Sequence, residues 1–109
     1  MPRETGLPPG TLIMLILRVL RQEPLHGYAI AQRIHQLSSQ ELQVEEGSLY
    51  PALQKLLLKG WVKSNWVLSE TNRQVRQYRV TSSGLKQLET EIAEYQRMNL
   101  AVQTVLETT

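Results

Sequence analysis

Residues 47–60 read GSLYPALQKLLLKG, and this stretch decides the fold. Its apolar residues recur at helical spacing, which predicts a helix from Ser48 to Lys59 with one leucine-rich buried face. Pro51 is compatible with that helix, because we expect it in the first turn, where a backbone amide has no intrahelical partner. Gly60 is expected to end the helix in a left-handed conformation.

The opposite face of this predicted helix is polar and basic, with small residues near its centre. Its candidate DNA-binding residues are Ser48, Tyr50, Pro51, Gln54, Lys55 and Lys59, with Ala52 between them. Small residues let a helix approach base edges in the major groove, and hydroxyl groups and helix-start amides donate to phosphate. Lysines supply the charge that releases counterions from DNA. The alternative for each residue taken singly is an ordinary solvated surface position.

A β-hairpin is predicted directly after this helix. Residues 61–68 and 75–80 are rich in β-forming residues, and the polar residues 70–74 lie between them as a turn. Two helices joined by a loop and followed by a two-stranded hairpin are the layout of a winged helix-turn-helix, in which the hairpin is the wing. Leu42 and Val44, before the central helix, alternate with polar residues and predict one further brief strand.

The wing supplies a second set of DNA-binding candidates. Asn72 and Arg73 lie in its predicted turn, where a wing would touch the minor groove or the adjacent phosphates. Arg76 and Arg79 point to opposite faces by strand alternation, so only one of them is expected to reach DNA. The sequence does not choose between these two arginines, and the other is free to pair with a glutamate.

Two helices are predicted before the central stretch, at residues 12–20 and 28–37. The first has Thr11 as its N-cap and is apolar nearly all round, a pattern typical of a helix buried on all sides. Because a domain of this size would struggle to cover such a helix alone, we expect a second subunit to cover one side of it. Leu12 and Ile16 are the interface candidates on this helix.

A long final helix is predicted, capped by Thr81 or Ser82 and ending near Leu106. Its seam at 3-4 spacing consists of Leu85, Leu88, Ile92, Tyr95, Asn99, Val102 and Leu106. Such a seam is typical of coiled-coil packing, and a single polar member such as Asn99 often fixes the register. A helix of roughly 25 residues is about 37 Å long. It would overhang the small body, which favours dimerisation over packing on its own domain.

The length of 109 residues suits one domain. We divide it into a winged helix-turn-helix at residues 1–81, with a flexible tail at 1–9, and a dimerisation helix at 82–109. Positive charge is concentrated between Tyr50 and Lys86, whereas acidic residues dominate afterwards. That distribution suits a protein with one face toward polyphosphate and another toward a different partner.

The composition also indicates in which cellular compartment the protein is expected to work. The chain contains no cysteine, which excludes disulfides, thiolate metal sites and cysteine nucleophiles. Its first residues do not resemble a signal peptide, and the apolar run at 12–20 is too short to span a bilayer. We therefore expect a reduced, cytoplasmic compartment without membrane association.

Catalytic function is not expected. The chain contains no aspartate and no cysteine, and no nucleophile–base pair or glycine-rich phosphate loop is visible. His26 is expected to hydrogen-bond in a turn or contact phosphate and His35 to be exposed, so the two form no metal site. Trp61 and Trp66 are expected to pack in the core or an interface, the alternative being that one lines a ligand pocket. We predict neither a cofactor nor a metal.

Three motifs together resemble the PadR family of bacterial transcriptional regulators. They are HGYAI at 26–30, GSLYPAL at 47–53 with the stretch 57–60 that follows it, and YRVT at 78–81 with Gly84. The resemblance extends from about Gly10 to Met98, and the combination is specific where either of the first two motifs alone would not be. Val80 stands where that family usually has leucine, a change expected to matter little. The short tail after Met98 resembles the small subfamily, which has a single C-terminal helix.

The resemblance implies a homodimeric winged-helix repressor, with the first and last helices forming the dimer interface. It also implies that Ser48, Tyr50 and Lys55 occupy recognition-helix positions and that Asn72 and Arg73 belong to the wing. Some members of the family lose DNA affinity on binding a phenolic acid or a hydrophobic drug. A pocket for such an effector between the first and last helices would be lined by Met14, Leu17, Tyr95 and Met98.

The expected fold is therefore mainly α with a two-stranded β-wing, a winged helix-turn-helix with a long C-terminal dimerisation helix. The expected partner is double-stranded DNA with an inverted-repeat operator whose half-sites lie about one or two turns apart. The alternative is a winged-helix module that binds another protein and not DNA. Lys55, Lys59 and Arg73 argue against that alternative, because a protein-binding module needs no positive charge on this face.

Overall fold

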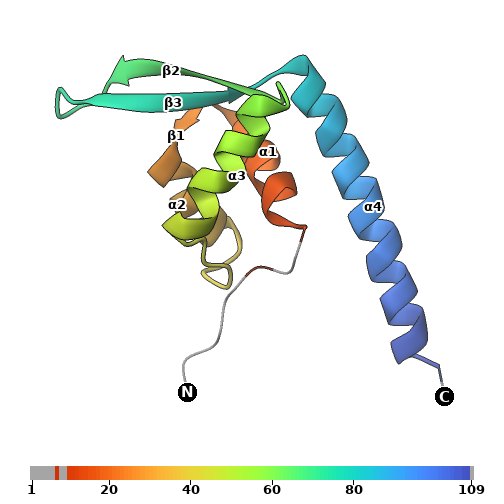
Figure 1. Cartoon of the computed structure of the whole chain (residues 1–109). Coiled ribbons are helices and arrows are strands. Elements are labelled where there is room, and N and C mark those ends of the chain that lie inside the picture. Colours follow the sequence, from red (N-terminus) through yellow and green to blue (C-terminus); the bar gives the residue numbers. More distant parts are fainter. Residues whose placement is uncertain (1–6, 8–9, 109) are drawn as a thin grey trace.

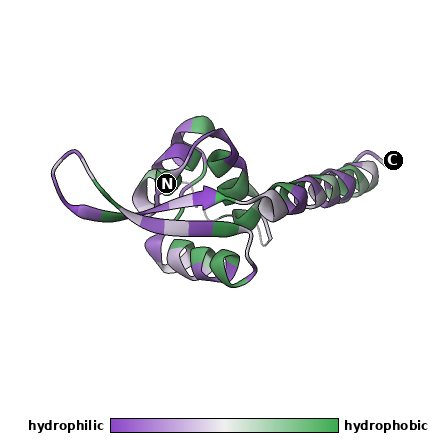
Figure 2. Ribbon diagram, turned by 90° about the horizontal axis from the view of Figure 1, so that it is seen from above, coloured by the Kyte–Doolittle hydropathy of each residue, from purple (hydrophilic) through white to green (hydrophobic). Residues whose placement is uncertain are grey.

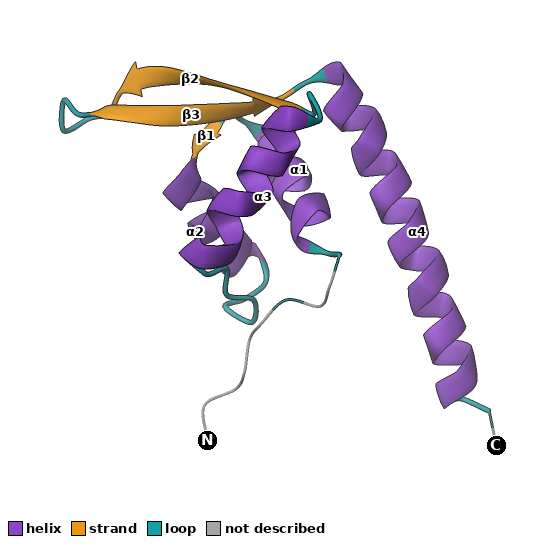
Figure 3. Ribbon diagram, viewed as in Figure 1, coloured by secondary structure: helices purple, strands orange, loops and turns teal. Residues whose placement is uncertain are grey.

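The computed structural model describes residue 7 and residues 10–108, so the tail expected at residues 1–9 lies, Leu7 apart, outside the described residues. The mainly helical fold with a β-wing is confirmed (Figures 1 and 3). The elements in chain order are α1 (Leu12–Gln22), β1 (Leu25–His26), α2 (Gly27–Leu37), α3 (Glu46–Leu58), β2 (Val62–Leu68), β3 (Gln74–Val80) and α4 (Ser82–Leu106).

The sheet has three antiparallel strands in the order β1-β3-β2, where a two-stranded hairpin was expected. The additional strand β1 pairs Leu25 with Tyr78 and His26 with Gln77. Two residues are too few to show an alternating pattern, so local sequence predicted only a turn here. The long-range pairing with β3 converts that turn into an edge strand.

The strand predicted at Leu42 and Val44 is wrong. The described residues 41–45 contain no strand, and both apolar side chains are half-buried against the core from a loop. Alternating apolar residues in a short segment show that one side is packed, and here that side packs without a neighbouring strand to pair with.

Helix α3 begins at Glu46, two positions earlier than predicted, so Pro51 lies in its second turn and not in its first. There a proline removes one intrahelical hydrogen bond and its ring crowds the carbonyl four residues earlier. In this chain that carbonyl belongs to Gly47, which is exposed and has no side chain. The expected left-handed end of the helix is confirmed, since Gly60 has a φ of 75°.

The core lies where α1 meets α2, α3, α4 and the sheet. Five α1 residues are buried by the chain itself: Met14, Ile16, Leu17, Val19 and Leu20. Leu12, Ile13 and Leu15 on the same helix are only half-buried, so the expectation that a second subunit covers one side of it stays a prediction. Ile16 is 0% exposed and belongs to the core of its own chain, so it is not available to an interface.

A tight joint connects the wing to α4. Thr81 caps the helix, because its Oγ1 accepts a hydrogen bond from the Gly84 amide at 3.0 Å and donates one to the Gly60 carbonyl at 2.7 Å. The Thr81 amide donates to the Trp61 carbonyl at 3.0 Å. A Cβ at Gly84 would lie 2.0 Å from that same carbonyl oxygen, so only glycine fits. These contacts set the direction in which α4 leaves the body.

The wing and α4 project from opposite sides of the helical body (Figures 1 and 2). Helix α4 packs mainly on α1, through its first turns. Leu88 is buried, Ile92 is half-buried, and every described residue from Ala93 onward is exposed. In the part of the chain that the structure describes, no helix is both long and apolar enough to cross a membrane.

Candidate nucleic-acid interface

All eight candidate DNA-binding residues are exposed, as the helical periodicity of α3 and the hairpin pattern predicted. Six belong to α3 or its C-cap, and two to the wing turn: Ser48, Tyr50, Pro51, Gln54, Lys55, Lys59, Asn72 and Arg73. The leucines Leu49, Leu53 and Leu56 of α3 face the core, so the opposite face is the one presented to solvent. The two lysines on this side, Lys55 in α3 and Lys59 at its C-cap, lie toward the C-terminal end of the helix, and Glu45 and Glu46 lie at its start.

The wing turn is held by its own hydrogen bonds. Ser69 accepts from the Asn72 amide at 2.9 Å through its carbonyl and from the Arg73 amide at 3.2 Å through Oγ, and its own amide donates to the Arg73 carbonyl at 2.8 Å. Asn72 has a φ of 64°, the left-handed conformation that asparagine tolerates better than most residues. Among the described residues, no ion pair engages the Arg73 side chain. The turn therefore presents a cation at the tip of the wing.

A groove of about 350 Å³ separates the start of α2 and α3 from the wing. Four aromatic side chains line it: Tyr28, Tyr50, Trp66 and Tyr78. The whole sequence contains only six aromatic residues, two Trp and four Tyr. Their gathering beside α3 was not predicted, because Tyr28, Trp66 and Tyr78 belong to three other elements and only tertiary packing brings them to Tyr50.

Tyr50 lies directly on the backbone of Gly27. A Cβ at position 27 would be 2.9 Å from Cε1 and 3.0 Å from the hydroxyl oxygen of the Tyr50 ring. The glycine of the HGYAI motif thus makes room for the tyrosine of the GSLYPAL motif. This contact is a physical reason for the two motifs to occur together.

The two wing arginines lie on opposite faces of the sheet, as strand alternation predicted. Arg76 faces the groove, where its guanidinium carbon lies 5.9 Å from the Trp66 ring centroid and 6.0 Å from that of Tyr78. Arg79 pairs across the strands with Lys63 on the opposite face of the sheet. In the described part of the chain, neither arginine forms an ion pair with a glutamate.

Burial raises the pKa of the Tyr78 phenol above its ordinary value of 10.0, and the neighbouring Arg76 charge opposes that shift. Tyr50 raises it further, because two phenolates close together would repel. Tyr78 is consequently a neutral phenol near pH 7.

Comparison with known proteins agrees with this geometry. The Transcriptional regulator PadR-like family matches residues 16–90. The chain belongs to this family. A PadR family transcriptional regulator from Eggerthella lenta has a similar structure, at 33% identity and a TM-score of 0.78, over 92% of this chain and 85% of that one. A transcriptional regulator from Clostridium thermocellum has a TM-score of 0.80 at 25% identity, over 87% of this chain and 92% of that one.

A curated relative, the 37.1 kDa protein in transposon TN4556 of Streptomyces fradiae, is 41% identical over 86 residues. The match covers 79% of this chain but only 23% of that protein. The chain therefore spans less than a quarter of the length of this relative. Members of the PadR-like family are transcriptional regulators and not enzymes, so the family assignment confirms that the chain is not an enzyme.

The seam predicted on the last helix of this PadR-family chain divides into two parts. Leu88 is 1% exposed and belongs to the core, which corrects its assignment to the interface. Ile92 is half-buried against the same core. The other seam residues are exposed: Leu85, Tyr95, Asn99, Val102 and Leu106. Leu12, the remaining interface candidate on α1, is half-buried.

Two apolar hollows lie beside α1. One, of about 200 Å³, is lined by Thr11, Met14, Leu15, Leu42 and Tyr95. The other, of about 320 Å³, continues past Leu15 and Leu42 along α2. Of the effector-pocket residues expected from the sequence, Met14 and Tyr95 line the first hollow. Leu17 is instead buried in the core, and Met98 is exposed and lines neither hollow.

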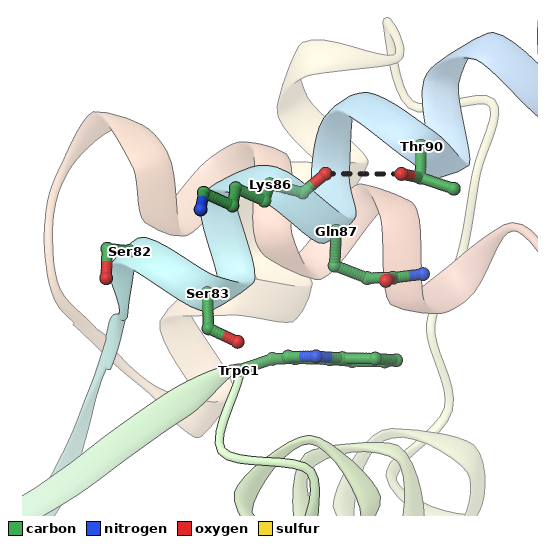
Figure 4. Close-up of a pocket in the computed structure, with 6 residues that line it drawn as sticks. All are labelled: Trp61, Ser82, Ser83, Lys86, Gln87 and Thr90. Atoms are coloured by element: carbon green, nitrogen blue, oxygen red, sulfur yellow. Dashed lines mark hydrogen bonds between the residues drawn. The ribbon is translucent and has the colours of Figure 1, made fainter.

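Trp61 agrees with the expected packing against the core, whereas Trp66 and His35 are placed differently from the expectation. Trp61 is half-buried and lines a cavity of about 370 Å³ under the first turns of α4, with Ser82, Ser83, Lys86, Gln87 and Thr90 (Figure 4). Trp66 is 64% exposed and is not a core residue, because its half of the wing extends beyond the helical body; the other expectation, packing in an interface, stays a prediction. His35 is half-buried, with Nδ1 2.8 Å from the Leu42 carbonyl oxygen. Among the described residues, no three His, Cys, Asp or Glu side chains gather as a metal site requires.

Proposed function

We propose that this chain is a homodimeric, sequence-specific repressor that binds an inverted-repeat operator in double-stranded DNA. One observation carries the proposal: Lys55 and Lys59 lie on the solvent-exposed face of α3 and its C-cap, and this face is flanked by a wing whose tip carries Arg73. A helix has the diameter that the major groove admits, and a basic turn beside it suits the adjacent minor groove or its phosphates.

In this proposal, DNA binding and dimerisation belong to the two parts of the chain on either side of the expected domain boundary. Residues 1–81 would contact DNA and residues 82–109 would pair two chains, with the first turns of α4 also completing the core through Leu88. The exposed apolar residues of the later α4 turns suit pairing with a second copy: Tyr95, Met98, Leu100, Val102, Val105 and Leu106. Apart from Leu100 these residues share one side of the helix, and an exposed apolar surface of this kind marks an interaction site.

A small hydrophobic or phenolic effector would relieve repression. The apolar hollow beside Met14, Leu15 and Tyr95 supports this part of the proposal, because it lies between the DNA-binding body and the proposed dimer helix. A molecule bound there could alter the angle between two recognition helices, and their spacing sets the fit to the two half-sites.

The test is a fluorescence anisotropy titration of the purified protein with a duplex from its own promoter region, at several salt concentrations. Binding in the range of about 10⁻⁸–10⁻¹¹ M that weakens steeply with salt is expected for a specific regulator. Absence of binding at low salt would favour the rival function, a winged-helix module for protein contacts.

Two substitutions test the proposed contact residues. Lys55→Gln on α3 and Arg73→Ala on the wing should each weaken binding and lower the salt slope by about 1, because each removes a cation placed beside DNA. Arg97→Gln is the matched control, since Arg97 lies on α4 in an ion pair with Glu94. A wild-type slope in Arg73→Ala would exclude the wing from the interface.

A further inference from the structure

Between α3 and the wing, the aromatic groove is placed where a DNA strand must cross. A helix in the major groove and a wing at the adjacent minor groove straddle one sugar–phosphate backbone, because that backbone separates the two grooves. The groove opens between these two elements and is lined from α3 by Tyr50 and from the wing by Trp66 and Arg76. We propose that it holds one backbone phosphate of the operator and that Arg76 is the residue that contacts it. This inference rests on the proposed function.

Arg76 is positioned for that contact before DNA arrives. Its Nε donates to the Ser64 hydroxyl at 3.0 Å, and its guanidinium stands between the rings of Trp66 and Tyr78. In the described part of the chain, its hydrogen bonds involve only Nε, which leaves the two terminal nitrogens to donate elsewhere. A guanidinium offers phosphate a planar pair of donors, and a preorganised side chain loses less entropy on binding.

The remaining groove lining favours an anion over a cation. None of the described side chains that line it is acidic, and Tyr28, Tyr50 and His26 add polar groups at its rim. The phenol hydroxyls donate to phosphate oxygens, and their rings present apolar faces to deoxyribose. The ring of Tyr50 reaches this position because Gly27 leaves space for it.

Arg79 provides the matched comparison. It follows Arg76 by three residues on the same strand β3, carries the same charge and is exposed, but it lies on the opposite face of the sheet beside Lys63. A general attraction between the basic wing and DNA would involve both arginines equally. A built phosphate site in the groove involves only Arg76.

The experiment measures promoter binding by full-length Arg76→Gln and Arg79→Gln at several salt concentrations, after circular dichroism has shown wild-type helix content. Arg76→Gln should lose about tenfold in affinity and lower the salt slope by about 1, and Arg79→Gln should stay within about twofold of wild type. Arg76→Lys keeps the charge without the fork and should retain the slope but only part of the affinity.

A second measurement locates the phosphate. Single neutral methylphosphonates are placed along the strand between the major-groove half-site and the adjacent minor groove. One position per half-site should weaken wild-type binding and leave Arg76→Gln unaffected. If no position does so, or if the two glutamine variants behave alike while Lys55→Gln still weakens binding, the groove is not a phosphate site although the chain binds DNA. Absence of DNA binding by the wild type would instead refute the proposed function itself.

Discussion

The two parts of α4 share one sequence pattern but have different surroundings. Leu88, in its first turns, is 1% exposed against α1, whereas Val102, two heptads later on the same seam, is 49% exposed. Both positions follow the 3-4 spacing of a packed helix face. Periodicity therefore identifies the apolar side of a helix, and it does not identify whether the helix's own chain covers that side.

The strongest test of this contrast is truncation of the buried member. Leu88→Ala should lower the free energy of unfolding by about 2–5 kcal/mol, because it removes a buried side chain and leaves a cavity. Urea unfolding followed by circular dichroism measures the change. Val102→Ala, examined at a concentration where dimers dissociate, is the control and should shift the free energy by less than about 0.5 kcal/mol. Equal losses of unfolding free energy in the two variants would contradict the conclusion that only the first turns of α4 are packed in the core.

The joint that sets the direction of α4 gives the next largest effect. Gly84→Ala should cost about 1–3 kcal/mol of stability, since its Cβ would collide with the Trp61 carbonyl oxygen and push α4 away from the wing. Gly47→Ala is the matched control, because nothing lies within 4 Å of a Cβ there. Thermal melts of the two variants should separate clearly. Similar melting temperatures would mean that the backbone around Gly84 accommodates a Cβ atom at little cost in stability.

Introducing a charged side chain tests whether the exposed part of α4 forms the dimer interface. Val102→Lys should convert dimers to monomers in analytical ultracentrifugation while the folded chain keeps its circular dichroism spectrum, because a lysine buried in a seam is costly. Ile92 is less suitable for this test, since it packs against the core of its own chain. Thr104→Lys, on another side of the helix, should leave the dimer intact. Dimers that persist in Val102→Lys would place the interface elsewhere.

The smallest effect concerns ionisation in the body. The raised pKa of Tyr78 means that the native state holds the phenolic proton more tightly than the unfolded chain. Its contribution to stability is thus fully present below pH 10.0 and is lost as the pH rises through the higher native pKa. Tyr78→Phe should flatten the decline of melting temperature above pH 10.0, and Tyr95→Phe, on the exposed part of α4, is the control. If the melting temperature of Tyr78→Phe declines above this pH as steeply as that of the wild type, the decline is caused by another titrating group.

Much of the fold could be predicted from local sequence. The buried leucines of α3, the left-handed Gly60 and the end of α4 at Leu106 all agree with their patterns. These features depend on periodicity and on the backbone preferences of single residues, which neighbouring residues reveal. For the same reason, all eight DNA-binding candidates were correctly expected to be exposed.

Other features were decided only by the tertiary structure. The strand β1, the burial of Ile16 and Leu88 within one chain, and the orientation of Arg76 toward Trp66 each depend on segments distant in sequence. A local pattern shows that a side chain is covered or that a strand has two faces. Only the packing of the whole chain shows which residues cover a given apolar side chain and which face of the wing is directed toward α3.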